Sequence, residues 1–226
     1  VRRGVEQLDR PRIVAAAHLH VTEVIKRLTG ARELVTGVAA LDATQVGSLT
    51  ETQVRGLTNL QLAALNTTDL GELSETQIGA LTRTQIGWLS GTQISNLTAT
   101  QTGALNSTQL GALSSSQLRA LTATDVGELT TTQLQALTGT QLGQLTNTAF
   151  AAFDGTQIGA LSVTQFRGVT ATQIGALTET DIGELTETQV GSLLSSQFAA
   201  LTATQLSALN VTQSGAITTT QIAWLS

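Results

Sequence analysis

An uninterrupted eight-residue repeat covers most of the chain and restricts its fold more than any other feature. From Leu41 to Trp224 the sequence divides into 23 octads without an insertion or deletion, and the consensus is L-T-x-T-Q-[ILV]-G-A. Position 1 is Leu in all but three octads, and position 6 is usually Ile, Leu or Val. A unit this short cannot bury an apolar face alone, so the repeat predicts a solenoid in which neighbouring units stack.

Position 2 of the octad is the most informative. It is Ser, Thr, Asn or Asp in every octad except the one with Leu194, and all four side chains accept a hydrogen bond from a free N–H at a helix start. Position 5 is Gln or Asp in every octad except the one with Ala149. A Gln or Asp three residues after the cap completes a capping box. The apolar residues at positions 1 and 6 have the spacing of a hydrophobic staple. Each octad therefore predicts a new helix start.

These signals predict an all-α superhelix of very short helices, one per octad. A single long helix does not fit, because eight residues advance a helix by about 800° and the Leu stripe would drift by about 80° per repeat. A β-solenoid is the alternative, since Thr and Ile favour strands, although alternation would mix buried and exposed positions on both faces. The expected helix caps include Thr50, Thr82, Thr122, Thr178 and Thr202, and the expected core includes Leu81, Ile86, Leu121, Val126, Leu177 and Ile182.

Position 8, often Ala, is expected to point inward with positions 1 and 6, and Gly at position 7 is expected to allow close backbone approach. Residues 1–40 do not follow the repeat, and we expect them to form an N-terminal helical cap over the end of the array. The octapeptide solenoid then occupies residues 41–226, as 23 octads plus a truncated one that we expect to continue in a longer protein.

Composition argues against several functions. Residues 1–40 hold seven Lys and Arg against four carboxylates, whereas the array holds four Arg against twelve Asp and Glu. Because phosphate binding needs cations, an acidic array is not expected to bind nucleic acid. No apolar run reaches the roughly 18 residues of a membrane span. Cysteine is absent, and His18 and His20 are the only histidines, so neither a thiolate metal site nor a catalytic triad is expected.

Other candidate residues have simpler explanations. Asp replaces Gln at Asp69, Asp125 and Asp181, each followed three residues later by Glu, but two carboxylates do not make a calcium loop. Their spacing of seven octads indicates either block duplication or a whole number of superhelical turns. The sequons at Asn66, Asn96, Asn106 and Asn210 are by-products of the repeat, and Trp88 and Trp224 are expected to fill the core or a groove. We expect no enzymatic activity, metal or cofactor.

Two functions remain open from the residues. Uniform register and a freely variable position 3 favour a structural spacer or scaffold. The recurring Thr-x-Thr at positions 2 and 4 is the alternative, an ice- or glycan-binding surface, although Asn and Asp at position 2 would interrupt such a ladder. The fragment could also associate end to end through apolar groups at its C-terminal end, and its other partners are not indicated.

The run L-[TS]-x-T-Q-[ILV]-x-A-L, from Leu41 to Ser226, resembles octapeptide arrays in very large bacterial proteins that look secreted or surface-exposed. This resemblance implies a bacterial origin, an extracellular or cell-surface location, and a role as stalk, spacer or adhesive segment. It implies no catalytic residue.

Overall fold

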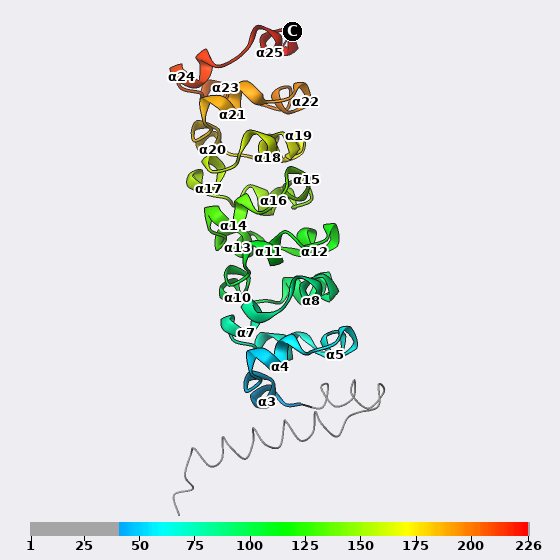
Figure 1. Ribbon diagram of the computed structural model, residues 1–226. Helices are drawn as coiled ribbons and strands as arrows, with labels where there is room; N and C mark the ends of the chain where they lie inside the picture. The colour runs from blue at the N-terminus through cyan, green and yellow to red at the C-terminus, as the bar shows by residue number, and fades with distance from the viewer. Residues whose placement is uncertain (1–40, 226) are drawn as a thin grey trace, which may run out of the picture.

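The computed structural model describes residues 41–225, and the regular structure in that range is helical. Figure 1 shows the short helices stacked in successive turns of an elongated rod. The described range holds 23 short α-helices and no strand, so the all-α prediction is confirmed and the β-solenoid alternative finds no support. The predicted N-terminal cap at residues 1–40 lies outside the described residues.

Each helix has four to six residues and occupies the same place in its octad. In chain order they are α3 (Ala43–Gly47), α4 (Glu51–Arg55), α5 (Asn59–Ala64), α6 (Thr67–Gly71), α7 (Glu75–Ala80), α8 (Arg83–Trp88), α9 (Gly91–Ser95), α10 (Ala99–Gly103), α11 (Ser107–Leu110), α12 (Ser115–Ala120), α13 (Ala123–Gly127), α14 (Thr131–Gln135), α15 (Gly139–Leu142), α16 (Asn147–Phe150), α17 (Gly155–Gly159), α18 (Val163–Gly168), α19 (Ala171–Gly175), α20 (Glu179–Gly183), α21 (Glu187–Ser192), α22 (Ser195–Phe198), α23 (Ala203–Ser207), α24 (Val211–Gly215) and α25 (Thr219–Ile222), followed by the 3-10 turn η1 (Ala223–Leu225).

Helix α8 illustrates how one octad starts and stops its helix. Thr82 is extended, with φ −72° and ψ 158°, and its hydroxyl accepts a hydrogen bond from the Gln85 N–H. The chain becomes extended again at Leu89, with φ −66° and ψ 139°. A helix of about one and a half turns is unstable in water, because nucleation costs more than so few hydrogen bonds return. The helices must therefore be held by contacts between octads.

Those contacts define the superhelical turn. Helices three octads apart pack together, as in α9 with α12 and α15 with α18. Most bonds between turns join residues 25 to 31 positions apart, including Arg55 Nε to Ala80 O at 25 and Gln85 Nε2 to the Leu57 and Val54 carbonyls at 28 and 31. These separations centre on 28 residues, or three and a half octads, so seven octads complete two turns. In Figure 1, α3, α10, α17 and α24 accordingly lie along one edge and α5, α12 and α19 along the other.

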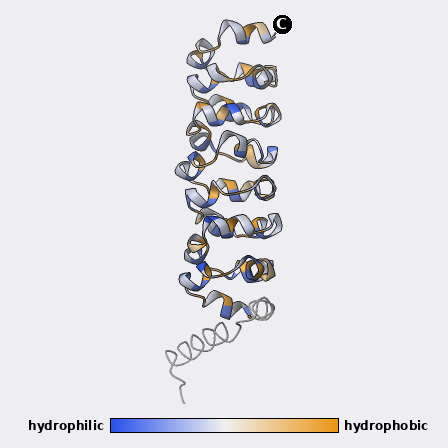
Figure 2. Cartoon of the chain, turned by 45° about the vertical axis from the view of Figure 1, so that its right-hand side comes forward, coloured by the Kyte–Doolittle hydropathy of each residue, from blue (hydrophilic) through white to orange (hydrophobic). Residues whose placement is uncertain are grey.

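The apolar core runs along the inside of the superhelix. From Val46 to Phe198 the position-6 side chain has no exposed surface, and position 1 is at most 8 % exposed from Leu49 to Leu201. Burying one such aliphatic side chain contributes about 1.5–3 kcal/mol, so a continuous cluster offsets the cost of ordering many short helices. Figure 2 shows hydrophobic residues recurring at every level of the rod.

Two expectations about positions 7 and 8 need correction. Most position-8 alanines are half-buried between turns, and Ala80 is the fully buried case. A Cβ on Gly143 would meet the Gly168 carbonyl at 2.6 Å, but a Cβ on Gly71 or Gly127 would meet nothing within 4 Å. Close approach therefore requires glycine at only some position-7 sites, because the spacing between turns is set by the local side chains.

Candidate interaction surface

The structure places the five expected cap residues at helix N-caps. The Thr50, Thr82, Thr122, Thr178 and Thr202 hydroxyls each accept a hydrogen bond from the backbone N–H three residues later, at 3.2–3.3 Å. The position-5 side chain returns the bond, as Gln85 Oε1 accepts the Thr82 N–H at 2.8 Å. Two exceptions show that each half of the capping box can form without the other. At Leu194 only the Gln197 half forms, and at Ala149 only the Thr146 half forms.

The position-5 glutamine also has a second role that the sequence reasoning missed. While its Oε1 caps its own helix, its Nε2 donates to main-chain carbonyls of the preceding turn. Gln109 Nε2, for example, donates to Ile78 O at 2.9 Å and to Leu81 O at 2.7 Å. Every position-5 glutamine from Gln77 to Gln221 makes such bonds to positions 28 to 31 residues earlier. We call this contact the glutamine clamp.

The glutamine clamp explains why a glutamine is buried in most octads. Gln109, Gln117 and Gln173 are each only 1 % exposed. A buried amide is stable only when its donor and acceptor are both satisfied, and here both are. One sequence signal could have revealed the clamp. A capping box accepts Glu as readily as Gln, yet position 5 is Gln in 19 octads and never Glu. This strong preference for the amide indicates a need for its N–H, which a carboxylate lacks.

The three Asp octads keep the cap and lack the clamp. The carboxylate oxygens of Asp69, Asp125 and Asp181 accept the backbone N–H of the N-cap residue at 2.7–2.9 Å. None can donate to the preceding turn. Asp125 is 3 % exposed and also accepts a bond from the buried Thr102 hydroxyl at 3.3 Å. Because seven octads make two turns, the three aspartates lie on the same side of the rod, as the whole-turn hypothesis requires.

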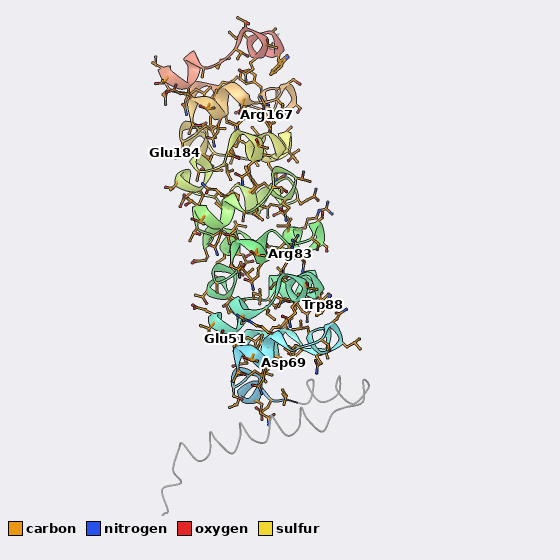
Figure 3. All side chains as sticks on the ribbon, in the orientation of Figure 1. Glu51, Asp69, Arg83, Trp88, Arg167 and Glu184 are labelled. Atoms are coloured by element: carbon orange, nitrogen blue, oxygen red, sulfur yellow. The ribbon has the colours of Figure 1, made fainter. Side chains whose placement is uncertain are left out.

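The expected core residues lie in the interior, and the two tryptophans differ from each other. Leu81, Ile86, Leu121, Val126, Leu177 and Ile182 are all buried, at 4 % exposure or less. Trp88 is 38 % exposed on the outside of the rod, as Figure 3 shows, so it is not a core residue. Trp224 is partly buried and its ring packs edge-on against Phe198, with centroids 6.4 Å apart.

Shallow grooves run between the cap segments of adjacent turns. Two of about 440 and 450 Å³ are lined by equivalent residues of different octads, one around Ser74, Thr98 and Thr100 and the other around Thr178, Thr202 and Thr204. A third, of about 560 Å³, also contains Arg55 and Arg83. Many groove hydroxyls are engaged locally: Thr98 and Thr100 are 3.1 Å apart, and Thr202 and Thr204 are 3.0 Å apart. The grooves are therefore regular, polar and largely self-satisfied.

The described residues include no group of three or more His, Cys, Asp or Glu side chains placed to hold a metal ion. His18 and His20 lie outside the described range. Within residues 41–225, no helix has the length and apolar character needed to span a bilayer. In this part of the chain the arrangement supplies caps, clamps and exposed surface.

A comparison with curated proteins finds no match. A family model described as the ALTTAQ repeat matches residues 60–91, which extend from α5 to the start of α9. With that match and one short helix in each of the 23 octads, residues 41–224 form an octapeptide-repeat array.

Proposed function

We propose that the array is a non-enzymatic spacer or scaffold that holds other parts of a larger protein at a fixed separation. The observation that carries the proposal is the glutamine clamp, which ties successive turns together by buried hydrogen bonds through most of the rod. Stability in such a solenoid is a sum of nearest-neighbour terms. Length can then be changed by adding or removing octads without rebuilding the core.

Small-angle X-ray scattering on matched deletions tests this proposal. Removing residues 89–144, a block of seven octads, should shorten the rod by two turns and rejoin equivalent octads in register. If turns are spaced like packed helices, at about 8–10 Å, the maximum dimension should fall by about 16–20 Å. Helicity per residue should stay constant. A maximum dimension that is insensitive to the deletion, or a compact particle, would contradict a spacer.

We also propose that the array belongs to a secreted or surface-exposed bacterial protein. The support is its resemblance to octapeptide arrays of such proteins. Protease treatment of intact source cells, followed by detection of the array with an antibody, distinguishes the locations: a surface array is cleaved, whereas one that persists until the cells are lysed is internal.

A second candidate function is ice or glycan binding, which is favoured by the regular hydroxyl-lined grooves between turns. The engagement of those hydroxyls in caps and with one another weighs against it. Thermal hysteresis and a glycan array measure the two activities directly. Activity in either assay that is lost when Thr76 and Thr100 are changed to Val would favour binding over a pure spacer.

A further inference from the structure

The four arginines of the described array are not spread evenly around the rod. Residues separated by a whole number of turns lie on the same side, and a turn contains 28 residues. Arg55 and Arg83 are separated by one turn, and Arg167 follows Arg83 after three more whole turns. We call these three residues the arginine row. Arg119 lies outside the row by about a quarter of a turn.

The exposed carboxylates occupy the opposite side. Of the nine exposed carboxylates, eight lie within a quarter of a turn of the line directly opposite the arginine row. We call these eight residues the acidic side: Asp42, Glu72, Glu75, Glu128, Asp154, Glu179, Glu184 and Glu187. Glu51 is the exception. Figure 3 shows Glu184 at one edge of the rod, with Arg83 and Arg167 away from that edge.

The guanidinium groups of the row are exposed and partly anchored. Arg55 Nε donates to Ala80 O at 3.1 Å, and Arg167 Nε donates to Ser192 O at 3.3 Å, in each case to the next turn. Each of these two side chains is thereby held against the rod by one of its five donors. Anchoring lowers the entropy that a side chain loses when it pairs with a partner.

The two sides also match in spacing along the axis. Asp42 precedes Arg55, Asp154 precedes Arg167 and Glu72 precedes Arg83, in each case by slightly less than half a turn. Consider a second copy moved sideways without rotation and shifted along the axis by about half a turn. Its acidic side then faces the arginine row, and all three arginines meet a carboxylate at once.

We infer that the array associates side by side and in parallel with a second copy of itself, the arginine row of one rod against the acidic side of the next. Exposed ion pairs are individually weak, so association depends on several pairs forming together. The contact uses different surfaces on the two copies, so it is heterologous and can continue to further copies. Each rod presents both surfaces, which suits a scaffold that is arranged in bundles.

Sedimentation velocity of the 226-residue chain over a concentration series tests the inference. At about 0.1 M salt the Debye length is about 10 Å, so the repulsion between the net negative charges of whole rods is screened while ion pairs in contact remain attractive. At about 1 M salt the Debye length is about 3 Å, and the ion pairs are screened as well. We expect reversible association at the lower salt concentration and monomer at the higher one. Arg83→Glu should weaken association by at least about fivefold, because it removes one good pair and brings two carboxylates together.

Matched variants separate this contact from other causes. Arg119→Glu makes the same change in charge outside the row and should leave association unchanged. Glu72→Arg should weaken association as Arg83→Glu does, and the two changes together should restore it. Because the two residues lie on opposite sides of one rod, the rescue cannot arise within a single chain.

Three results would overturn the inference: monomer at about 0.1 M salt at every concentration, equal effects of Arg83→Glu and Arg119→Glu, or no rescue in the double variant. Arg167→Glu provides an independent repeat in another turn, and far-UV circular dichroism verifies that each variant is folded.

Discussion

The glutamine clamp leads to a quantitative prediction at Gln109. This side chain is 1 % exposed; its Oε1 accepts the Asn106 N–H at 2.7 Å, and its Nε2 donates to Ile78 O at 2.9 Å and Leu81 O at 2.7 Å. The substitution Gln109→Glu keeps the shape and the accepting oxygen. It replaces the donating nitrogen with an oxygen that faces two carbonyl oxygens.

The expected cost follows from those contacts. Leaving a buried hydrogen-bonding group without a partner costs about 1–3 kcal/mol. Leu81 O loses this donor, whereas Ile78 O keeps the Leu81 N–H at 3.1 Å, so the free energy of unfolding should fall by at least about 1–3 kcal/mol near pH 7. Burial also raises the pKa of the introduced carboxyl. The penalty is then greatest above that raised pKa and shrinks as the pH falls toward the ordinary carboxyl value of about 4.3, because a protonated carboxyl can donate to one carbonyl.

Urea unfolding followed by far-UV circular dichroism, at about pH 7 and at about pH 4.3, measures the loss of stability. Gln135→Glu is the matched control, because Gln135 is an exposed position-7 residue; a surface change of this kind stays within about 0.5 kcal/mol. If both variants lost the same stability, or if the Gln109→Glu loss did not depend on pH, the second role of the glutamine would be refuted.

Two further substitutions test the cap and the close approach between turns. Thr122→Ala should cost about 1 kcal/mol in urea unfolding, and no loss would show that its hydroxyl does not support the helix. Gly168→Ala should destabilise by several kcal/mol, since a Cβ there would meet the Gly139 backbone at 2.2–2.4 Å. Gly127→Ala is its control, because a Cβ at Gly127 would meet nothing within 4 Å and the helix should gain about 0.5–1 kcal/mol. Equal unfolding midpoints for the two variants would contradict the close packing of Gly168 on Gly139.

The local features of the fold could be read from the octad, because they depend on contacts between neighbouring positions of the chain. The capping box of Thr82 and Gln85, and the burial of Leu81 and Ile86, follow from spacing that is visible in one repeat. The glutamine clamp could not be read in the same way, since its acceptors lie a full turn earlier in the chain and their position depends on the superhelical geometry. The absence of Glu at position 5 was the available signal.

The surface could be interpreted only once the turn was known. On the octad period alone, Arg55 and Arg167 are two position-7 residues, and Arg83 is an unrelated position-3 residue. On the period of the superhelical turn they form one row. Trp88 and Leu60 behave in the same way: they are separated by one turn and both are exposed, at 38 % and 59 %. The octad period thus predicts which residues are buried in the rod. The period of the superhelical turn predicts which exposed residues lie side by side on its surface.

The two periods together explain the spacing of the Asp octads. The structure shows that seven octads make a whole number of turns, and block duplication stays a prediction that is compatible with this geometry. A turn of three and a half octads cannot be duplicated alone without breaking an octad. Seven octads are the shortest block that contains both whole octads and whole turns. Duplicating that block lengthens the rod by two turns and leaves every downstream side chain facing its original direction. Asp69, Asp125 and Asp181 can therefore recur at seven-octad intervals on one side while the charged surfaces stay in register.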